Sequence, residues 1–304
     1  SDKSVLISIG DDTAAVKVSK GKTLLATTDL LTEGIHFDLR YISFFQLGAK
    51  ALLVNISDIA AMAGIPRYAL IAIAVPDNIK IEELNEIYRG IKKTASAYKV
   101  SIIGGDTSGS KNGLMINITL LGEAKQGNIV KRDGAKPGDK IFVTGTLGDS
   151  SAGLELLKNG KRKGFLINRH LRPTPRIKEA YFIAKNRFAT SMIDVSDGVA
   201  TDLNHICEQS RVGAVIFEDK IPLSKELKKA ELKKGPLEYA LSGGEDYELL
   251  FTVKRKNVKN IYDAISRNRL SATMIGEITK KGILLVDREG MQRPLLPTGF
   301  NHFK

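Results

Sequence analysis

Ser191-Met-Ile-Asp-Val-Ser-Asp-Gly-Val-Ala200 is the stretch from which we interpret the fold. Its apolar run 192–195 predicts a short strand, and the amphipathic run 199–209 predicts a helix, with a tight turn between them. Ser and Asp are favoured N-cap residues, so we expect one of them to cap this helix. Asp194 and Asp197 would then meet near the positive end of the helix, which suits hard cations and phosphate oxygens. A plain cap would explain Asp197 but not Asp194.

The composition is that of a water-soluble globular protein. The chain has 304 residues, of which 42% are hydrophobic and 26% charged, enough for one large domain or two of ordinary size. No apolar run approaches the roughly 20 residues of a membrane span, and no signal-peptide pattern opens the chain. Cys207 is the single cysteine, which excludes an intramolecular disulfide and a thiolate zinc site. We therefore expect a cytoplasmic protein without a membrane partner.

The net charge of +12 raises the hypothesis of a nucleic-acid-binding protein. The excess is uneven: residues 1–135 carry 16 basic and 14 acidic residues, and residues 136–304 carry 30 and 20. No aromatic residues interleave with the lysine runs, as a single-strand binding groove would require. We favour a solvated lysine-rich surface and expect no nucleic-acid partner.

The first half predicts a mixed α and β domain in which strands end at acidic residues. We expect helices over 46–63 and 81–98. The predicted strands cover 4–10, 22–28, 68–75, 100–103 and 114–123. Asp12 and Asp29 follow the first two of these strands, and Asp106 follows the fourth in a glycine-rich loop, 104–109, that lets a backbone approach a ligand.

The helix predicted over 46–63 carries Asn55 and Asp58 on one face, three residues apart. Burying an unpaired carboxylate in such an apolar helix is unfavourable, so these groups need a partner. A metal or a bound ligand would supply one, and so would a neighbouring lysine or a cap.

We place the domain boundary in the polar segment 130–139, which gives domains 1–135 and 136–304. The second domain begins with a strand at 140–144 and continues with predicted helices at 152–158, 224–234 and 258–268. Further strands are predicted at 214–217, 249–253, 272–278 and 283–286.

Two segments of the second domain have residues that could bind phosphate. The glycine-rich turn 145–153 precedes a helix, although neither a P-loop nor a G-x-G-x-x-G pattern occurs in the chain. In the turn 170–176, Arg172 and Arg176 lie beside prolines; pairing with nearby carboxylates is the simpler expectation for them.

Six aspartates stand at or after the ends of predicted strands or on the helix predicted over 46–63. If they converge, their mutual repulsion requires cations, and oxygen ligands without cysteine favour Mg²⁺ over zinc. Magnesium beside glycine-rich turns points to a nucleoside triphosphate and to phosphoryl transfer. The six are Asp12, Asp29, Asp58, Asp106, Asp194 and Asp197.

Eight motifs in register carry a family resemblance that spans nearly the whole chain. The chain resembles the thiamine-monophosphate kinases, in the superfamily of aminoimidazole ribonucleotide synthetase and selenophosphate synthetase. The motifs are Ile9-Gly-Asp-Asp-Thr13, Thr27-Thr-Asp29, Val54-Asn-Ile-Ser-Asp58, Ile103-Gly-Gly-Asp106, Thr144-Gly-Thr-Leu-Gly-Asp-Ser150, His170-Leu-Arg-Pro173, Ile193-Asp-Val-Ser-Asp-Gly198 and Ser242-Gly-Gly-Glu-Asp-Tyr-Glu248.

The resemblance implies an α+β, two-domain fold. A mixed-sheet N-terminal domain would dimerise through its sheet, an α/β C-terminal domain would follow, and the active site would lie in the cleft between them. It also implies ATP-dependent phosphorylation of thiamine monophosphate to thiamine diphosphate, with several Mg²⁺ ions and ATP as co-substrate, in a homodimer.

The resemblance assigns site residues position by position. Relatives often have tryptophan near the position of Phe300, where a phenylalanine ring would still stack on the substrate. The implied magnesium ligands are Asp12, Thr27, Thr28, Asp29, Asp58, Asp106, Asp194 and Asp197. The implied ATP contacts are Gly105, Asp106, Arg132 and Ser196. The implied substrate contacts are His36, Glu245 and Phe300, although a lone histidine such as His36 is more often structural than functional.

Two alternatives remain open at this point. A sister enzyme such as aminoimidazole ribonucleotide synthetase shares these residue types, whereas the selenophosphate enzyme needs a reactive cysteine or selenocysteine in an N-terminal glycine-rich loop, where this chain has none. A basic nucleic-acid-binding protein is the alternative from another class.

Overall fold

The structure, a computed structural model, describes residues 4–7 and 15–299. The chain forms two compact units: unit 1 comprises Ser1–Ala60 and Gly64–Ile129, and unit 2 comprises Ala61–Ala63 and Val130–Lys304. The units therefore divide after Ile129, close to the boundary that we place after residue 135.

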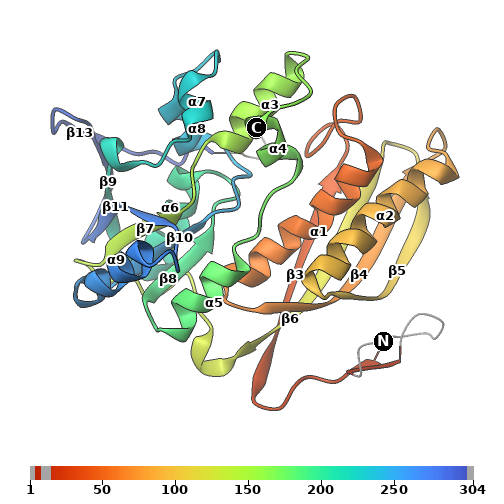
Figure 1. Cartoon of the computed structure of the whole chain (residues 1–304), viewed down its shortest axis with the longest axis horizontal. Coiled ribbons are helices and arrows are strands. Elements are labelled where there is room, and N and C mark those ends of the chain that lie inside the picture. Colours follow the sequence, from red (N-terminus) through yellow and green to blue (C-terminus); the bar gives the residue numbers. More distant parts are fainter. Residues whose placement is uncertain (1–3, 8–14, 300–304) are drawn as a thin grey trace. The chain divides into compact units, whose positions relative to one another are not determined.

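Unit 1 is built on a four-stranded mixed sheet (Figure 1). Its strand order is β3-β6-β4-β5, with β6 antiparallel to both of its neighbours and β4 parallel to β5. The strands are β3 (Lys22–Thr32), β4 (Ile65–Pro76), β5 (Ser101–Ser110) and β6 (Met115–Lys125). A short antiparallel pair, β1 (Val5–Ile7) and β2 (Ala15–Val16), lies outside this sheet, and the 3-10 turn η1 (Gln126–Asn128) follows β6.

Helices α1 (Phe44–Ala61) and α2 (Ile81–Tyr98) cover one face of this sheet (Figure 1). They pack closely at two reciprocal glycines. A Cβ on Gly48 would lie 2.0 Å from the carbonyl oxygen of Ile87, and one on Gly90 would lie 2.0 Å from that of Phe45. Only glycine allows this approach of the two helix backbones.

Helix α1 is long and apolar enough, by length and composition, to cross a membrane. However, 78% of this segment is buried inside the protein. It therefore has the burial of a core helix, in agreement with its packing against α2 and the sheet.

Unit 2 contains a seven-stranded sheet with the order β13-β12-β9-β11-β7-β10-β8. Of the pairs among its described strands, only β9 with β12 is parallel. The sheet is thus mixed, with mainly antiparallel pairs, and differs from the parallel sheet typical of an α/β domain. The strands are β7 (Lys140–Thr144), β8 (Ala189–Asp194), β9 (Gly213–Phe217), β10 (Leu249–Val253), β11 (Ala272–Thr279), β12 (Ile283–Val286) and β13 (Gln292–Pro294).

An apolar core lies between the unit 2 sheet and helix α6, with Ile193, Leu203, Ile206 and Leu250 all buried in it. The helices of this unit are α3 (Asp149–Lys158), α4 (Phe165–Leu171), α5 (Ile177–Lys185), α6 (Val199–Ser210), α7 (Lys225–Lys229), α8 (Pro236–Ser242) and α9 (Val258–Ser266), with 3-10 turns η2 (Glu218–Lys220) and η3 (Arg255–Asn257).

Three predicted elements differ most from the described structure, and others begin or end a few residues from their expected positions. Strand β3 continues through Asp29 to Thr32 because every residue of it pairs with β6. The predicted loop 104–109 is part of β5, since β4 supplies parallel partners for it. The predicted helix 224–234 ends at Lys229, and Lys233 instead donates its N–H to Glu155 at 2.9 Å.

Candidate functional site

The strand, turn and helix predicted around Asp194 are present as β8, a four-residue loop and α6. Backbone hydrogen bonds tie this loop to the segment before β10: Val195 N–H donates to Glu248 O, and Tyr247 N–H donates to Val195 O, both at 2.8 Å. Asp194 is buried at the end of β8, and Asp197 is half-buried in the loop. The motif thus fixes both aspartates on a rigid frame.

The predicted side-chain cap of α6 is wrong. The N-cap is Gly198, with φ 107° and no side-chain cap hydrogen bond. Glycine is required there by the positive φ and by a close approach to the backbone of Ser242, since a Cβ on Gly198 would lie 3.0 Å from the Ser242 carbonyl carbon. Instead, Oδ2 of Asp202 in the first turn of α6 accepts the N–H of Asp197 at 3.1 Å.

Acidic groups converge at the start of α6. Burial, together with the charges of Asp194 and Asp197, raises the pKa of Asp202 to about 8. Ligand atoms of Asp197, Asp202 and His205 lie within 4.8 Å of one another. The two carboxylates at this distance repel each other, and the charge of Asp194 adds to the repulsion, so the arrangement suits a divalent cation.

A second pair of carboxylates lies in unit 1. Burial, and to a lesser extent the charge of Asp58 on α1, raises the pKa of Asp29 on β3 to about 7. The hydroxyl of Thr27 donates to Oδ2 of Asp58 at 2.5 Å. Strand β3 and helix α1 therefore bring three of the predicted metal ligands to one place.

Thr28, also a predicted metal ligand, points its side chain the other way. Side chains alternate along a strand, so Thr28 lies on the face opposite to Thr27 and Asp29. Its hydroxyl is 3.1 Å from that of Thr119 on β6 and 3.4 Å from Oδ1 of Asn117. Only the backbone carbonyl of Thr28 could join a site on the α1 side.

Asp106 and Gly105 lie on β5, at the other edge of the sheet from Asp29. Three strand spacings of about 4.8 Å separate the edges, so the two strands are roughly 14 Å apart. The sheet of one unit therefore does not bring Asp106 to the Asp29 pair. A Cβ on Gly105 would lie 2.0 Å from Ile71 O, so this glycine permits close strand packing rather than the loop that we expect from sequence.

Three further predicted site residues are in unit 2 and lie around the α6 loop. Arg132 is close enough to Asp202 for its positive charge to oppose the upward shift of that pKa. Ser196 lies in the loop, and its carbonyl accepts the N–H of Glu245 at 2.7 Å. The structure thus gathers Arg132, Ser196 and Glu245 with Asp194 and Asp197.

His36 and two terminal positions complete the predicted set. His36 follows β3, where its Nδ1 accepts the N–H of Thr32 at 3.0 Å, a bond that holds the turn. Asp12 and Phe300 lie outside the described residues.

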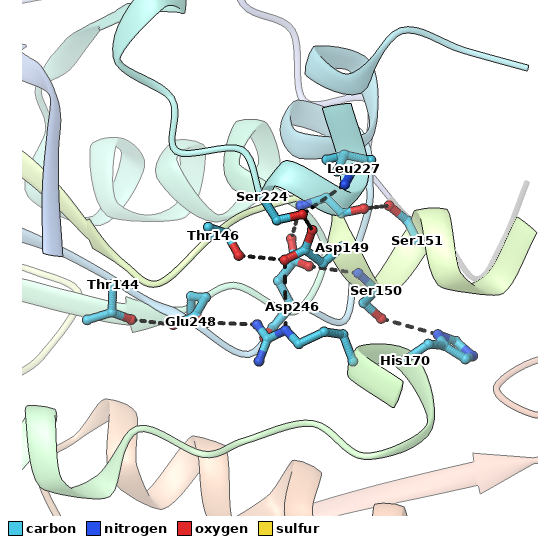
Figure 2. Close-up of polar contacts among 12 residues, drawn as sticks. Thr144, Thr146, Asp149, Ser150, Ser151, His170, Ser224, Leu227, Asp246 and Glu248 are labelled. Atoms are coloured by element: carbon cyan, nitrogen blue, oxygen red, sulfur yellow. Dashed lines mark hydrogen bonds and ion pairs between the residues drawn. The ribbon is translucent and has the colours of Figure 1, made fainter. Parts of the chain in front are cut away.

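The glycine-rich turn before α3 holds an internal carboxylate (Figure 2). The N–H groups of Gly148 and Ser150 donate to Asp246 at 2.6 and 3.1 Å. Asp246 is buried, and its burial raises its pKa to about 7. The N-terminus of α3 is thereby occupied by the protein's own acid, which argues against the phosphate-binding role that its sequence allows.

Two arginines near the 170–176 turn pair with a buried carboxylate. For Arg176, this confirms the expectation that it pairs with a nearby carboxylate. Glu248 is fully buried and accepts the hydroxyl of Thr144 at 2.6 Å. Arg169 Nη2 donates to Glu248 Oε1 at 2.7 Å, and Arg176 Nε donates to Oε2 at 2.6 Å. Arg176 donates hydrogen bonds to both carboxylate oxygens of Glu248, and this bidentate geometry adds specificity to the ion pair.

Sequence reasoning missed Asp202 and His205. A signal for Asp202 was present, because it stands on the buried side of an amphipathic helix beside Leu203 and Ile206. An acid in such a position needs a partner. His205 follows one turn later on the same side of α6.

Comparison with known proteins identifies the family. Residues 10–124 match the model of the AIR synthase related protein N-terminal domain, and residues 136–287 match that of its C-terminal domain. Together these matches cover most of the chain.

Curated relatives and solved structures agree. The chain is 41% identical over 302 residues to the thiamine-monophosphate kinase of Aquifex aeolicus (97% of this chain, 92% of the relative). It is 38% identical to that of Bacillus subtilis (99% and 94% covered). The crystal structure of thiamine-monophosphate kinase from Stenotrophomonas maltophilia K279a has a TM-score of 0.85 at 32% identity, covering 93% and 92%. The structure of AaThiL complexed with AMPPCP and TMP has a TM-score of 0.83 at 41% identity, covering 97% and 92%. The chain therefore belongs to the thiamine-monophosphate kinase family and is an enzyme.

Proposed function

We propose that this protein transfers the γ-phosphoryl group of ATP to thiamine monophosphate, yielding thiamine diphosphate and ADP. The observation that carries the proposal is the grouping of carboxylates at two places, Asp29 with Asp58 in unit 1 and Asp194 with Asp197 and Asp202 in unit 2. Membership of the family and the AaThiL structure with AMPPCP, an ATP analogue, and TMP support the choice of substrates.

The donor set fits Mg²⁺. Its oxygen atoms come mainly from carboxylates, which this hard cation prefers. Oδ1 of Asn55, one turn before Asp58 on α1, is buried without a hydrogen-bond partner in the described part of the chain, and a hydrated cation nearby would supply one. The proposed ligands are Asp12, Thr27, Thr28, Asp29, Asp58, Asp106, Asp194 and Asp197, with Thr28 acting through its backbone.

Bound Mg²⁺ would neutralise charge on the phosphate oxygens and align them. The acceptor is a phosphate monoester whose second pKa is about 6, so it is largely a dianion at neutral pH and needs no strong general base. The main obstacle is the repulsion between two anions, which Arg132 also relieves. We propose direct in-line transfer without a phosphoenzyme.

The remaining residues would bind the substrates. Gly105, Asp106, Arg132 and Ser196 are the proposed ATP contacts. His36, Glu245 and Phe300 are the proposed contacts of the thiamine end. A homodimer formed through the unit 1 sheet, an active site between the two domains and a cytoplasmic location also belong to this proposal.

The test is incubation of the protein with ATP, Mg²⁺ and either thiamine monophosphate or formylglycinamidine ribonucleotide. We expect thiamine diphosphate and ADP in equal amounts from the first substrate, detected by chromatography, and no turnover of the second. Product from the second substrate alone would instead identify a sister enzyme. Strong, steeply salt-dependent nucleic-acid binding without ATP turnover would support the other class.

A further inference from the structure

The segment His170–Arg176 has no part in the proposed function, yet its first residue contacts a proposed substrate ligand. His170 Nδ1 lies 3.2 Å from Oε2 of Glu245 and 3.2 Å from the hydroxyl oxygen of Ser150. The His170 side chain is only 4% exposed, whereas that of Glu245 is 26% exposed. Glu245 can therefore reach a ligand, and the contact between the two side chains lets the buried His170 act on that ligand through Glu245.

The backbone around Glu245 is held in an unusual conformation. Glu245 has φ 65° and Tyr247 has φ 51°, both in the left-handed region that residues with a Cβ rarely adopt. Each such residue is unfavourable for the backbone and persists only where surrounding contacts enforce it. Two sets of contacts hold the backbone in this conformation. Asp246 is hydrogen-bonded at the start of α3, and Glu245 N–H donates to Ser196 O.

These contacts fix the backbone of Glu245 but not the direction of its side chain. With Glu245 ionised, the favourable tautomer of His170 carries its proton on Nδ1 and donates to the carboxylate. Ser150 links the two anchors, because its N–H donates to Asp246 and its hydroxyl lies beside His170 (Figure 2). The imidazole is thus held by α3 and in turn holds Glu245.

We propose that His170 is a positioning residue for the thiamine end of the substrate, fixing the Glu245 carboxylate in the orientation that binds it. The inference rests on the substrate role proposed for Glu245. It gives the stretch from Arg169 to Arg176 two tasks, since Arg169 and Arg176 pair with Glu248 and His170 orients Glu245. Such a role predicts weaker binding of one substrate only.

The experiment compares three variants of His170 by titration calorimetry with thiamine monophosphate and by steady-state kinetics for each substrate. H170F removes the donor and should weaken thiamine monophosphate binding about tenfold, or about 1.4 kcal/mol. H170N carries an amide N–H near the Nδ1 position and should retain most of the affinity. H170Q fills the site with a displaced donor and should behave like H170F, which keeps the test open if H170F does not fold. Asn168→Ala, an exposed change on α4, is the control.

A double-mutant cycle separates positioning from general damage. If His170 acts through Glu245, H170F (or H170Q) should add little in an E245Q background. The KM for ATP should stay within about twofold throughout, because that subsite is built from other residues. Additive effects, or equal rises in both KM values, would overturn the proposal. An E245Q variant with unchanged affinity would instead reject the substrate role of Glu245, a distinct result.

Discussion

The backbone N–H of Gly148 donates a 2.6 Å hydrogen bond to the carboxylate of Asp246, 98 residues away in the sequence. Asp246 also accepts the N–H of Ser150, so one buried acid satisfies two amides at the start of α3. Asp246→Ala would leave both N–H groups buried without an acceptor and should destabilise the protein by about 2–4 kcal/mol. Thermal unfolding of the variant checks this, with Asp246→Asn, which keeps one acceptor oxygen, expected to lie between it and wild type.

The same group predicts a pH dependence. Burial raises the pKa of Asp246 from 3.8 to about 7 in the folded protein. Because the folded pKa is the higher one, its contribution to stability is fully present below about pH 4 and is lost as the pH rises through 7. A shift of about three units corresponds to at most about 4 kcal/mol. The Tm of wild type minus that of Asp246→Asn should therefore fall between pH 5.5 and pH 8.5. A difference that grows over this interval would contradict the assignment.

Removal of Mg²⁺ should expose the repulsion between Asp29 and Asp58. In EDTA, Asp58→Asn should raise the Tm, because it removes one of two like charges while keeping an oxygen for the hydroxyl of Thr27. Addition of millimolar Mg²⁺ should stabilise wild type by linkage and stabilise the variant less. Scanning fluorimetry of both proteins with and without the metal makes the comparison. An equal response to Mg²⁺ in both would remove Asp58 from the metal site.

The contact between α1 and α2 gives a prediction about packing. Gly90→Ala places a Cβ 2.0 Å from Phe45 O, so the helices must move apart. We expect a loss of about 1–3 kcal/mol despite the better helix propensity of alanine. Gly127→Ala is the control in the same unit, since no heavy atom lies within 4 Å of its Cβ position. Similar thermal midpoints for the two variants would show that the helices tolerate separation.

The sequence predicts local elements well where its periodicity changes clearly. The strand and helix around Asp194 follow from an apolar run and an amphipathic run on either side of Ser196-Asp197-Gly198. Strand β5 was not predicted in full, because its glycine-rich half lacks β-forming residues and owes its conformation to pairing with β4. Propensity cannot indicate a partner strand that supplies the hydrogen bonds.

The candidate site was predictable only in part, for a related reason. The acids near Asp194 are close in sequence, so their convergence could be inferred. The partners of Asp246 and Glu248 come from the end of β7, the start of α3, helix α4 and the residue before α5. They lie 72 to 104 residues away, and no spacing rule joins them. Asp202 could have been predicted from its place on the buried face of helix α6. The role of Thr28 depended on strand alternation, which becomes usable only when β3 is known to continue past it.

The buried ion pairs of Glu248 should be among the more important stabilising contacts of unit 2. Glu248→Gln removes the charge closest to Arg169 and Arg176, whose side chains are at most 20% exposed. Their remaining carboxylate partners are more distant, Asp149 at 4.0 Å from Arg169 and Glu179 at 3.7 Å from Arg176. Breaking a buried pair in this way typically destabilises by about 3–5 kcal/mol. Because Glu248 O also accepts the N–H of Val195, we expect hydrogen exchange to quicken in the Asp194 loop as well as the Tm to fall. The matched control is Glu238→Gln, which breaks the half-exposed pair with Lys234 and should change stability by less than about 1 kcal/mol. If both variants lose the same small amount, the Glu248 pairs contribute no more than a surface ion pair.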